Sequence, residues 1–218
     1  QWGRYDLLIL PPSFPFGGME NPRLSFITPS VLAGDRSLVS LIAHELAHSW
    51  SGNLVSNRTW RDLWLNEGIT SYLDARLMEA LYGKDRADEE RVLAWRSLVQ
   101  GLEIVPEEMQ PLAPVFEDGH PDQGQQGLQY AKGQMFLIHL EALFGREAFD
   151  EFLAAYLTVS HFRPSAAQWA HSHDTSGLRS AGRKRAGSVD GERDIQALET
   201  RLSPHHQSSY RPPAERPA

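Results

Sequence analysis

The chain has 218 residues, with 21 Lys or Arg and 28 Asp or Glu, so its formal net charge is −7. This acidic balance argues against non-specific nucleic-acid binding, which requires a basic surface. No apolar run approaches the roughly 20 residues that a membrane span needs. Because cysteine is absent, disulfides, thiolate metal sites and a cysteine nucleophile are excluded. We therefore expect neither nucleic acid nor a membrane among the partners.

The N-terminus lacks the features of a native start. Gln1 is not preceded by Met, and neither a charged nor an apolar signal-peptide segment follows it. We expect a piece of a longer protein, so the lack of a targeting segment says nothing about compartment. We adopt a cytoplasmic location as the expectation, although a chain without cysteine fits a reducing or an oxidising compartment equally. The oligomeric state cannot be predicted.

The composition changes near Trp169. Residues 1–169 carry the acidic excess and nearly all the large apolar side chains, whereas residues 170–218 are rich in Ser, Gly, Arg, His and Pro. Such a segment cannot bury enough apolar surface to offset its conformational entropy. We therefore predict one folded domain over 1–169 and a polar, disordered tail over 170–218. The basic run Arg183–Arg185 is interpreted as part of that tail rather than as a nucleic-acid site.

The predicted elements are two strands followed by helices. Tyr5–Leu10 favours a strand that ends at two prolines, and Arg23–Thr28 alternates between two prolines, which favours a second strand near a sheet edge. Asp35 or Ser37 is the predicted cap of the first helix. The apolar periodicity and the glycine stops predict five helices, near Leu38–Trp50, Arg61–Tyr82, Asp85–Gly101, Gln129–Phe144 and Arg146–Ser160. The expected fold is mainly α, with a small β element in front of a helical bundle.

The most informative motif is the run from His44 to His48, which reads His-Glu-Leu-Ala-His. Histidines four residues apart lie on one face of a helix, so both imidazoles can bind one cation. Glu45 is rotated by about 100° from His44, which suits contact with a water molecule at the metal better than ligation. The alternative is a chance coincidence of two histidines and a glutamate.

Glu67 strengthens the metal hypothesis. It follows His48 after 18 intervening residues, inside the run Trp64–Gly68, and a returning helix can bring its carboxylate to the two imidazoles. Two His and one Glu leave one coordination position open, which is the catalytic zinc arrangement. The alternative interpretation of Glu67 is a solvated helix residue. We predict one zinc ion held by these three side chains.

The predicted centre indicates amide hydrolysis without a covalent intermediate. Zinc lowers the pKa of water and polarises a carbonyl oxygen, and Glu45 can act as the general base and then return the proton to the leaving amine. An acceptor behind each imidazole should orient it, and Asp62 is a candidate for that role. No Ser/His/Asp pattern supports a serine nucleophile.

These residues resemble the gluzincin aminopeptidase family that includes aminopeptidase N. The resemblance rests on His44–His48, on Glu67 and on the motif Gly17–Asn21, and it is closest to the branch containing aminopeptidase B and leukotriene hydrolase. It is dense as far as Tyr82, resumes at Tyr130–Gly133 and fades after Phe162. Further runs that resemble this branch are Tyr5–Leu8, Pro11–Pro22, Leu32–Asp35, His48–Trp50 and Gly52–Val55.

The resemblance implies a thermolysin-like zincin domain that acts on peptides with a free N-terminus. It implies that Glu20 binds the substrate α-ammonium group and that Tyr130 donates a hydrogen bond to the tetrahedral oxyanion. A surface salt bridge and a packed aromatic residue are the respective alternatives. The other motif residues implied to bind substrate are Gly17, Gly18, Met19 and Asn21.

Two positions distinguish the branches of the family. Gln125 stands where the leukotriene hydrolase branch has a second Tyr, so we expect weak or no epoxide hydrolysis. Asp122 matches an Asp of that branch that can attract a basic substrate side chain. Family members also carry domains on both sides of this segment. Two alternatives to an aminopeptidase therefore stay open: a bifunctional epoxide hydrolase, and an inactive zinc-binding fragment.

Overall fold

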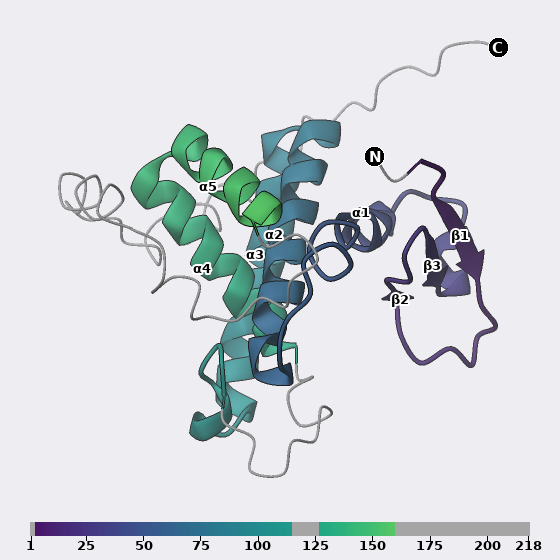
Figure 1. The fold of residues 1–218 in the computed structure, drawn as a ribbon. Coiled ribbons are helices and arrows are strands. Elements are labelled where there is room, and N and C mark those ends of the chain that lie inside the picture. Colours follow the sequence, from purple (N-terminus) through teal and green to yellow (C-terminus); the bar gives the residue numbers. More distant parts are fainter. Residues whose placement is uncertain (1–2, 115–126, 160–218) are drawn as a thin grey trace, which may run out of the picture.

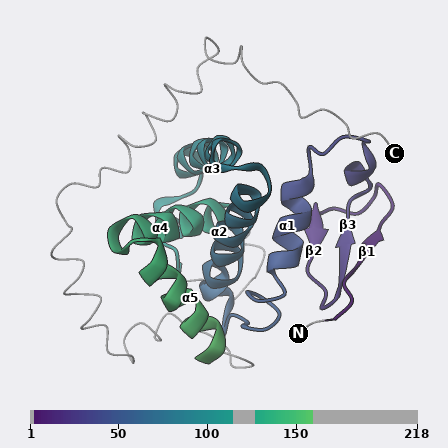
Figure 2. The same cartoon turned by 90° about the horizontal axis from the view of Figure 1, so that it is seen from above.

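The computed structural model describes residues 3–114 and 127–159. The predicted tail over 170–218 and the boundary near Trp169 lie outside the described residues, as do Asp122 and Gln125. A small sheet stands at one side of the described part, helix α1 lies next to it, and the remaining helices gather on the other side of α1 (Figures 1 and 2). This arrangement confirms the expected fold, a small β element followed by packed helices.

The sheet has three strands in the order β1-β3-β2. Strand β1 (Asp6–Ile9) runs parallel to β3 (Leu24–Ile27), and β2 (Gly18–Met19) pairs antiparallel with β3. The prediction that the second strand lies near an edge is therefore wrong, because this strand is central. The two prolines lie outside the paired span, where they remove no ladder hydrogen bond. Strand β2 was not predicted, since two residues carry no readable alternation.

The helices follow the predicted order with small shifts at their ends. Two short 3₁₀ helices, Pro29–Leu32 and Trp60–Asp62, precede α1 and α2, and a third covers Glu107–Met109. The α-helices are α1 (Val39–Ala47), α2 (Leu63–Tyr82), α3 (Lys84–Ile104), α4 (Leu128–Phe144) and α5 (Arg146–Val159).

The helix ends show which local signals were correct. Gly83 and Gly145 end α2 and α4 with φ of +88° and +87°, conformations that favour glycine. The predicted cap of α1 is wrong: the N-cap residue is Leu38, whose apolar side chain cannot accept a hydrogen bond, and Asp35 accepts hydrogen bonds from Ser37. Helix α1 also ends at Ala47, three residues before the predicted Trp50.

The main apolar core joins α2, α4 and α5, and α2 runs through its centre. Tyr72 is 1% exposed, and its hydroxyl donates to Glu141 of α4 at 2.6 Å. Burial of each large apolar side chain contributes roughly 1.5–3 kcal/mol, which stabilises the packing of α2, the helix that carries Glu67. The buried members of this core are Val55, Leu65, Ile69, Tyr72, Leu137, Phe149, Leu153 and Tyr156. Across residues 3–114 and 127–159, no helix is both long and apolar enough to span a bilayer.

Candidate metal centre

Three polar atoms from two helices converge at the contact between α1 and α2. The Nε2 atoms of His44 and His48 lie 3.1 Å apart. Glu67 Oε2 lies 3.3 Å from His44 Nε2 and 3.4 Å from His48 Nε2. The structure thus brings together the three residues that the sequence predicted as metal ligands, although 18 residues separate Glu67 from His48 in the chain.

Each imidazole is held by an acceptor on its far side. His44 Nδ1 lies 2.8 Å from Asp74 Oδ2, and His48 Nδ1 lies 2.9 Å from the carbonyl oxygen of Ser51. Because a carbonyl or carboxylate oxygen only accepts, Nδ1 of each ring carries a proton, and a ring in its neutral form therefore presents a lone pair on Nε2. Asp62 was a candidate for this role, but the acceptors behind the two rings are Asp74 and Ser51, and Asp62 accepts from Thr59 at 2.9 Å.

The centre requires positive charge. Nε2 of both imidazoles and a carboxylate oxygen of Glu67 face one another, and Glu67 Oε2 is buried with the two ring nitrogens at 3.3 and 3.4 Å. Two ligand atoms bound about 2.0–2.1 Å from a tetrahedral zinc ion lie about 3.3 Å apart. The observed separations of 3.1–3.4 Å match this value. The donor set and its spacing therefore fit a zinc ion.

The pKa shifts of His44 and Glu67 also favour positive charge at this centre. Burial alone would lower the pKa of His44, but hydrogen bonds to Asp74 and Glu67 outweigh it and raise this pKa well above its usual value. Burial would raise the pKa of Glu67, but hydrogen bonds from His44 and His48 hold it well below its usual range. The three side chains therefore stabilise a cation between them, which can be a proton or a metal ion.

Glu45 lies next to the convergence point and is 5% exposed. Burial raises its pKa to about 7, opposed by the two histidines. Its Oε2 atom is buried and has no hydrogen-bond partner among the described residues. A Cβ atom on Gly18 would lie 2.0 Å from Glu45 Oε1, so only glycine at this position of β2 leaves room for the carboxylate. The predicted general base thus lies between the metal centre and β2.

Glu20 follows β2 and lies on the same side of the centre. Carboxylate atoms of Glu20 and Glu45 and a ring nitrogen of His48 lie within 4.8 Å of one another. Glu20 Oε1 also accepts a hydrogen bond from Asn66 Nδ2 at 3.3 Å. Two carboxylates this close form a site for a cationic group next to the candidate metal position.

The other residues of the Gly-Gly-Met-Glu-Asn run build the edge strand. Within the described residues β2 pairs with β3 alone, so the backbone of its other edge is free to bind an extended ligand. Gly17 accepts from the Thr28 amide at 2.8 Å, and the Asn21 amide donates to the Met19 carbonyl at 2.9 Å. This hydrogen bond between Met19 and Asn21 closes the turn that carries Glu20.

Tyr130 reaches the centre from the first turn of α4. Its ring stacks on that of His44, with centroids 6.0 Å apart and an interplanar angle of 21°. Burial, the charge of Glu67 and a hydrogen bond to Glu67 raise the pKa of Tyr130 far above its usual value. The phenol therefore stays protonated and can donate a hydrogen bond at any physiological pH.

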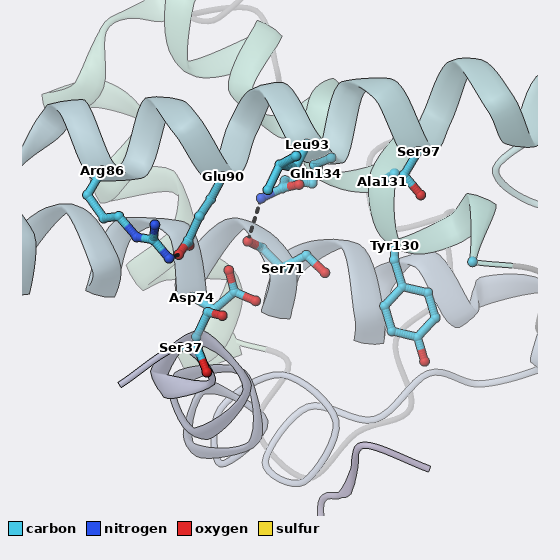
Figure 3. A pocket seen from close by; sticks show the side chains of 13 residues that line it. Ser37, Ser71, Asp74, Arg86, Glu90, Leu93, Ser97, Tyr130, Ala131 and Gln134 are labelled. Atoms are coloured by element: carbon cyan, nitrogen blue, oxygen red, sulfur yellow. Dashed lines mark hydrogen bonds and ion pairs between the residues drawn. The ribbon is translucent and has the colours of Figure 1, made fainter. Parts of the chain in front are cut away.

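A cavity of about 490 Å³ borders the centre, with walls from α1, α2, α3 and α4 (Figure 3). Asp74 and Tyr130 line it, and Gln134 donates to the Ser71 carbonyl at 2.9 Å on its wall. The three candidate ligands are not among its lining residues. The cavity thus reaches the centre through Asp74 and Tyr130.

Sequence reasoning missed two residues that support the ligands. Asp74 follows Glu67 by seven residues, so it lies on the same face of α2, two turns further along; helical periodicity could have identified it. Asn66 precedes Glu67 and places its Oδ1 atom 3.0 Å from His48 Nδ1. Its adjacency to Glu67 in the run Trp64–Gly68 was the only signal.

Comparisons with known proteins identify the family and the fold of this chain. Residues 1–173 match the model of the peptidase family M1 domain. A leucine aminopeptidase 2 from Aspergillus niger is 46% identical over 160 residues, which cover 72% of this chain and 26% of the relative. A leukotriene A-4 hydrolase homolog from Botryotinia fuckeliana is 44% identical over 161 residues, which cover 73% and 25%.

Solved structures show the same fold. Yeast LTA4 hydrolase in complex with bestatin superimposes with a TM-score of 0.79 at 36% identity, covering 88% of this chain and 31% of that one. A zinc metallopeptidase from Deinococcus radiodurans, at 21% identity and a TM-score of 0.59, shares the fold. The chain spans about a quarter of the length of the curated relatives that it matches. The match to the family model and the shared fold show that this chain belongs to peptidase family M1.

Proposed function

We propose that this chain is the catalytic part of a zinc aminopeptidase, which removes the N-terminal residue of a peptide. The observation that carries the proposal is the convergence of His44, His48 and Glu67 at tetrahedral spacing, with the buried Glu45 beside them. Relatives named leucine aminopeptidase support the same activity. A peptide with a free N-terminus is the proposed substrate.

His44, His48 and Glu67 are the proposed ligands of a single zinc ion. When bound, zinc in such a site lowers the pKa of water towards 7 and polarises a carbonyl oxygen. Asp74 and Ser51 hold the imidazoles in the tautomer that this role needs. Three protein ligands leave a position open for solvent or substrate.

Glu45 is the proposed general base. It takes a proton from the attacking water and gives it to the leaving nitrogen as the peptide bond breaks. A general base works best when its pKa lies near the working pH, and burial raises the pKa of Glu45 to about 7. Gly18 leaves space for the carboxylate and, with Gly17, provides backbone groups for an extended substrate.

Glu20 is the proposed acceptor of the α-ammonium group. Its position beside Glu45 sets a fixed distance between the charged N-terminus and the reacting carbonyl, which makes the enzyme an exopeptidase. Met19 and Asn21 hold the turn that carries Glu20. Asp122 is a proposed contact for a basic N-terminal side chain, and a panel of Arg, Lys, Leu and Ala anilides would test it.

Tyr130 is the proposed donor to the oxyanion. Its raised pKa keeps the phenolic proton in place, and stacking on His44 fixes the ring beside the metal centre. A single donor of this kind is typically worth ~3 kcal/mol of the activation barrier.

Steady-state hydrolysis of leucine p-nitroanilide by the zinc-loaded chain tests the activity. We expect turnover that a chelator abolishes and that added zinc restores. Nα-acetyl-leucine p-nitroanilide, which has no α-ammonium group, should not be cleaved. Equal cleavage of both substrates, or turnover that survives zinc removal, would contradict the proposal.

A second candidate is a zinc-binding chain without turnover. It is favoured by the fact that the chain spans only about a quarter of its curated relatives, whose remaining length could contribute to the active site. Stoichiometric zinc binding with no hydrolysis would support it. A bifunctional epoxide hydrolase is the third alternative, and Gln125 argues against it. A cytoplasmic location is likewise proposed and can be tested by cell fractionation.

A further inference from the structure

Asn66 lies between two groups with different proposed tasks. Its Oδ1 atom is 3.0 Å from Nδ1 of the metal ligand His48. Its Nδ2 atom donates to Oε1 of Glu20, the proposed α-ammonium acceptor, at 3.3 Å. Asn66 is 8% exposed, so water competes little for these contacts. One amide thus touches both the metal centre and the site for the substrate N-terminus.

The chemistry of the neighbours determines how this amide is oriented. His48 Nδ1 carries a proton because it lies 2.9 Å from the Ser51 carbonyl oxygen, which only accepts. The Asn66 atom facing it must therefore be the carbonyl oxygen. The amide nitrogen is left to face Glu20, which as a carboxylate accepts. A flipped amide would set two donors against each other at one end and two acceptors at the other.

The loop after α1 packs closely against the Asn66 amide in this orientation. A Cβ atom on Gly52 would lie 2.5 Å from Asn66 Oδ1 and 2.9 Å from His48 Nδ1, and Gly52 has a φ of +115° that favours glycine. The Ser51 hydroxyl donates to the carbonyl oxygen of Leu65, immediately before Asn66, at 2.8 Å. The loop after α1 therefore packs directly against both bonded groups and the first turn of α2.

We propose that Asn66 is a positioning residue that links the α-ammonium acceptor Glu20 to the metal ligand His48, and so sets where the substrate N-terminus lies relative to the metal. The inference rests on the proposed function, since it uses the role of Glu20 given there. Its consequence is specific: Asn66 acts on the binding of a free amine through its nitrogen, and on His48 through its oxygen. The two effects can be separated by substitution.

Asn66→Asp separates them, because a carboxylate still accepts from His48 Nδ1 but repels the carboxylate of Glu20. Two measurements are needed, zinc affinity by competition with a chromophoric chelator and calorimetric binding of bestatin, which has a free amine. We expect zinc affinity within about threefold of the unmodified chain and bestatin binding at least about tenfold weaker, the size typical of a disrupted buried polar contact. Asn57→Asp, the same change in the loop before α2, should alter neither.

A double-mutant cycle with Glu20→Gln isolates the link. In the Glu20→Gln background the repulsion is gone, so Asn66→Asp should change bestatin affinity by less than about threefold. An equal loss of bestatin affinity in both backgrounds, or no loss in either, would overturn the link. Loss of zinc binding by Asn66→Asp would also overturn it, because the effect would then be structural.

These readouts do not depend on turnover. If the unmodified chain fails to hydrolyse leucine p-nitroanilide while the cycle gives the expected coupling, the proposed function fails and the link stands. If bestatin and its Nα-acetyl derivative bind the unmodified chain equally, Glu20 does not bind the amine, and both the role of Glu20 and the link are contradicted.

Discussion

Gly68 and Gly133 face each other where α2 crosses α4. A Cβ atom on Gly68 would lie 2.8 Å from the Cα atom of Gly133, closer than folded proteins allow. The contact is one residue after the candidate ligand Glu67 and three residues after Tyr130. The close crossing of the two helices therefore brings Tyr130, the proposed oxyanion donor, to the candidate metal centre.

Gly68→Ala should separate the two helices, because the added methyl group meets backbone atoms that have no flexible side chain to move. Such overpacking costs about 1–3 kcal/mol, and we expect that decrease in the free energy of unfolding, measured with urea. Gly101→Ala is the matched control, since its Cβ would meet only a Leu128 methyl group at 3.2 Å. A variant as stable as the unmodified chain would contradict the account of this crossing.

Glu45→Gln should retain zinc and lose hydrolysis. The amide preserves the size of the side chain but cannot take a proton, and general-base catalysis contributes about 10²–10⁴-fold to rate. We expect kcat for leucine p-nitroanilide to fall by that amount with unchanged zinc content by elemental analysis. Glu103→Gln, an exposed change on α3, serves as the control. Normal turnover in Glu45→Gln would refute the assigned base.

Tyr130→Phe should reduce kcat and leave KM and zinc affinity nearly unchanged, because the phenol is proposed to act on charge that develops only in the transition state. Loss of such a donor lowers kcat by about 10²–10³-fold. The exposed residue Tyr82 provides the control Tyr82→Phe. A rise in KM without a fall in kcat would assign Tyr130 to ground-state binding instead.

Asp74→Ala should weaken zinc binding, because His44 loses the acceptor that orients it at 2.8 Å. Removal of such partners costs about 10–100-fold in metal affinity, which a competing chelator would measure. Asp85→Ala, an exposed change at the start of α3, should have no effect. Unchanged affinity in Asp74→Ala would show that the ring is held by its surroundings alone.

Zinc binding should release a proton near neutral pH. The pKa of His44 is raised in the zinc-free chain, so this ring is protonated at pH 7–8, whereas a ligand must be neutral. Zinc affinity should therefore rise with pH until the raised pKa is reached. Calorimetry in two buffers of different ionisation enthalpy measures the released proton. Equal binding enthalpies in both buffers would contradict the raised pKa.

The raised pKa of His44 also makes the stability of the zinc-free fold depend on pH. A folded-state pKa above the unfolded value of 6.5 means that protonated His44 stabilises the zinc-free fold most below pH 6.5. That contribution is lost as the pH rises through the raised pKa. The zinc-free chain should thus lose stability towards alkaline pH, and zinc should restore it.

The convergence of the three candidate metal ligands could be predicted because its signal is local geometry. A spacing of four residues places His44 and His48 on one helical face whatever the rest of the fold does. The prediction for Glu67 required only that a second helix fold back against the helix that carries His44. By contrast, the acceptor behind His44 was not predicted: Asp74 shares a face of α2 with Glu67, but its contact with the ring depends on how α2 packs against α1.

The fold was predictable to the level of its helices, for a related reason. Glycine stops such as Gly83 and Gly145 act through their own φ angle. The central position of Leu24–Ile27 in the sheet depends instead on a partner strand of two residues, Gly18–Met19, which shows no periodicity. The link from Glu20 to Asn66 joins residues 46 positions apart and became visible only in the structure.

Locating the bound metal ion tests the proposed zinc site without relying on any assay of activity. Anomalous diffraction at the zinc absorption edge, from crystals of the zinc-loaded chain, locates the ion independently of any assay. The account predicts one peak about 2.0–2.2 Å from His44 Nε2, His48 Nε2 and a carboxylate oxygen of Glu67. A peak bound elsewhere, or a saturated crystal with no peak between these three atoms, would contradict it.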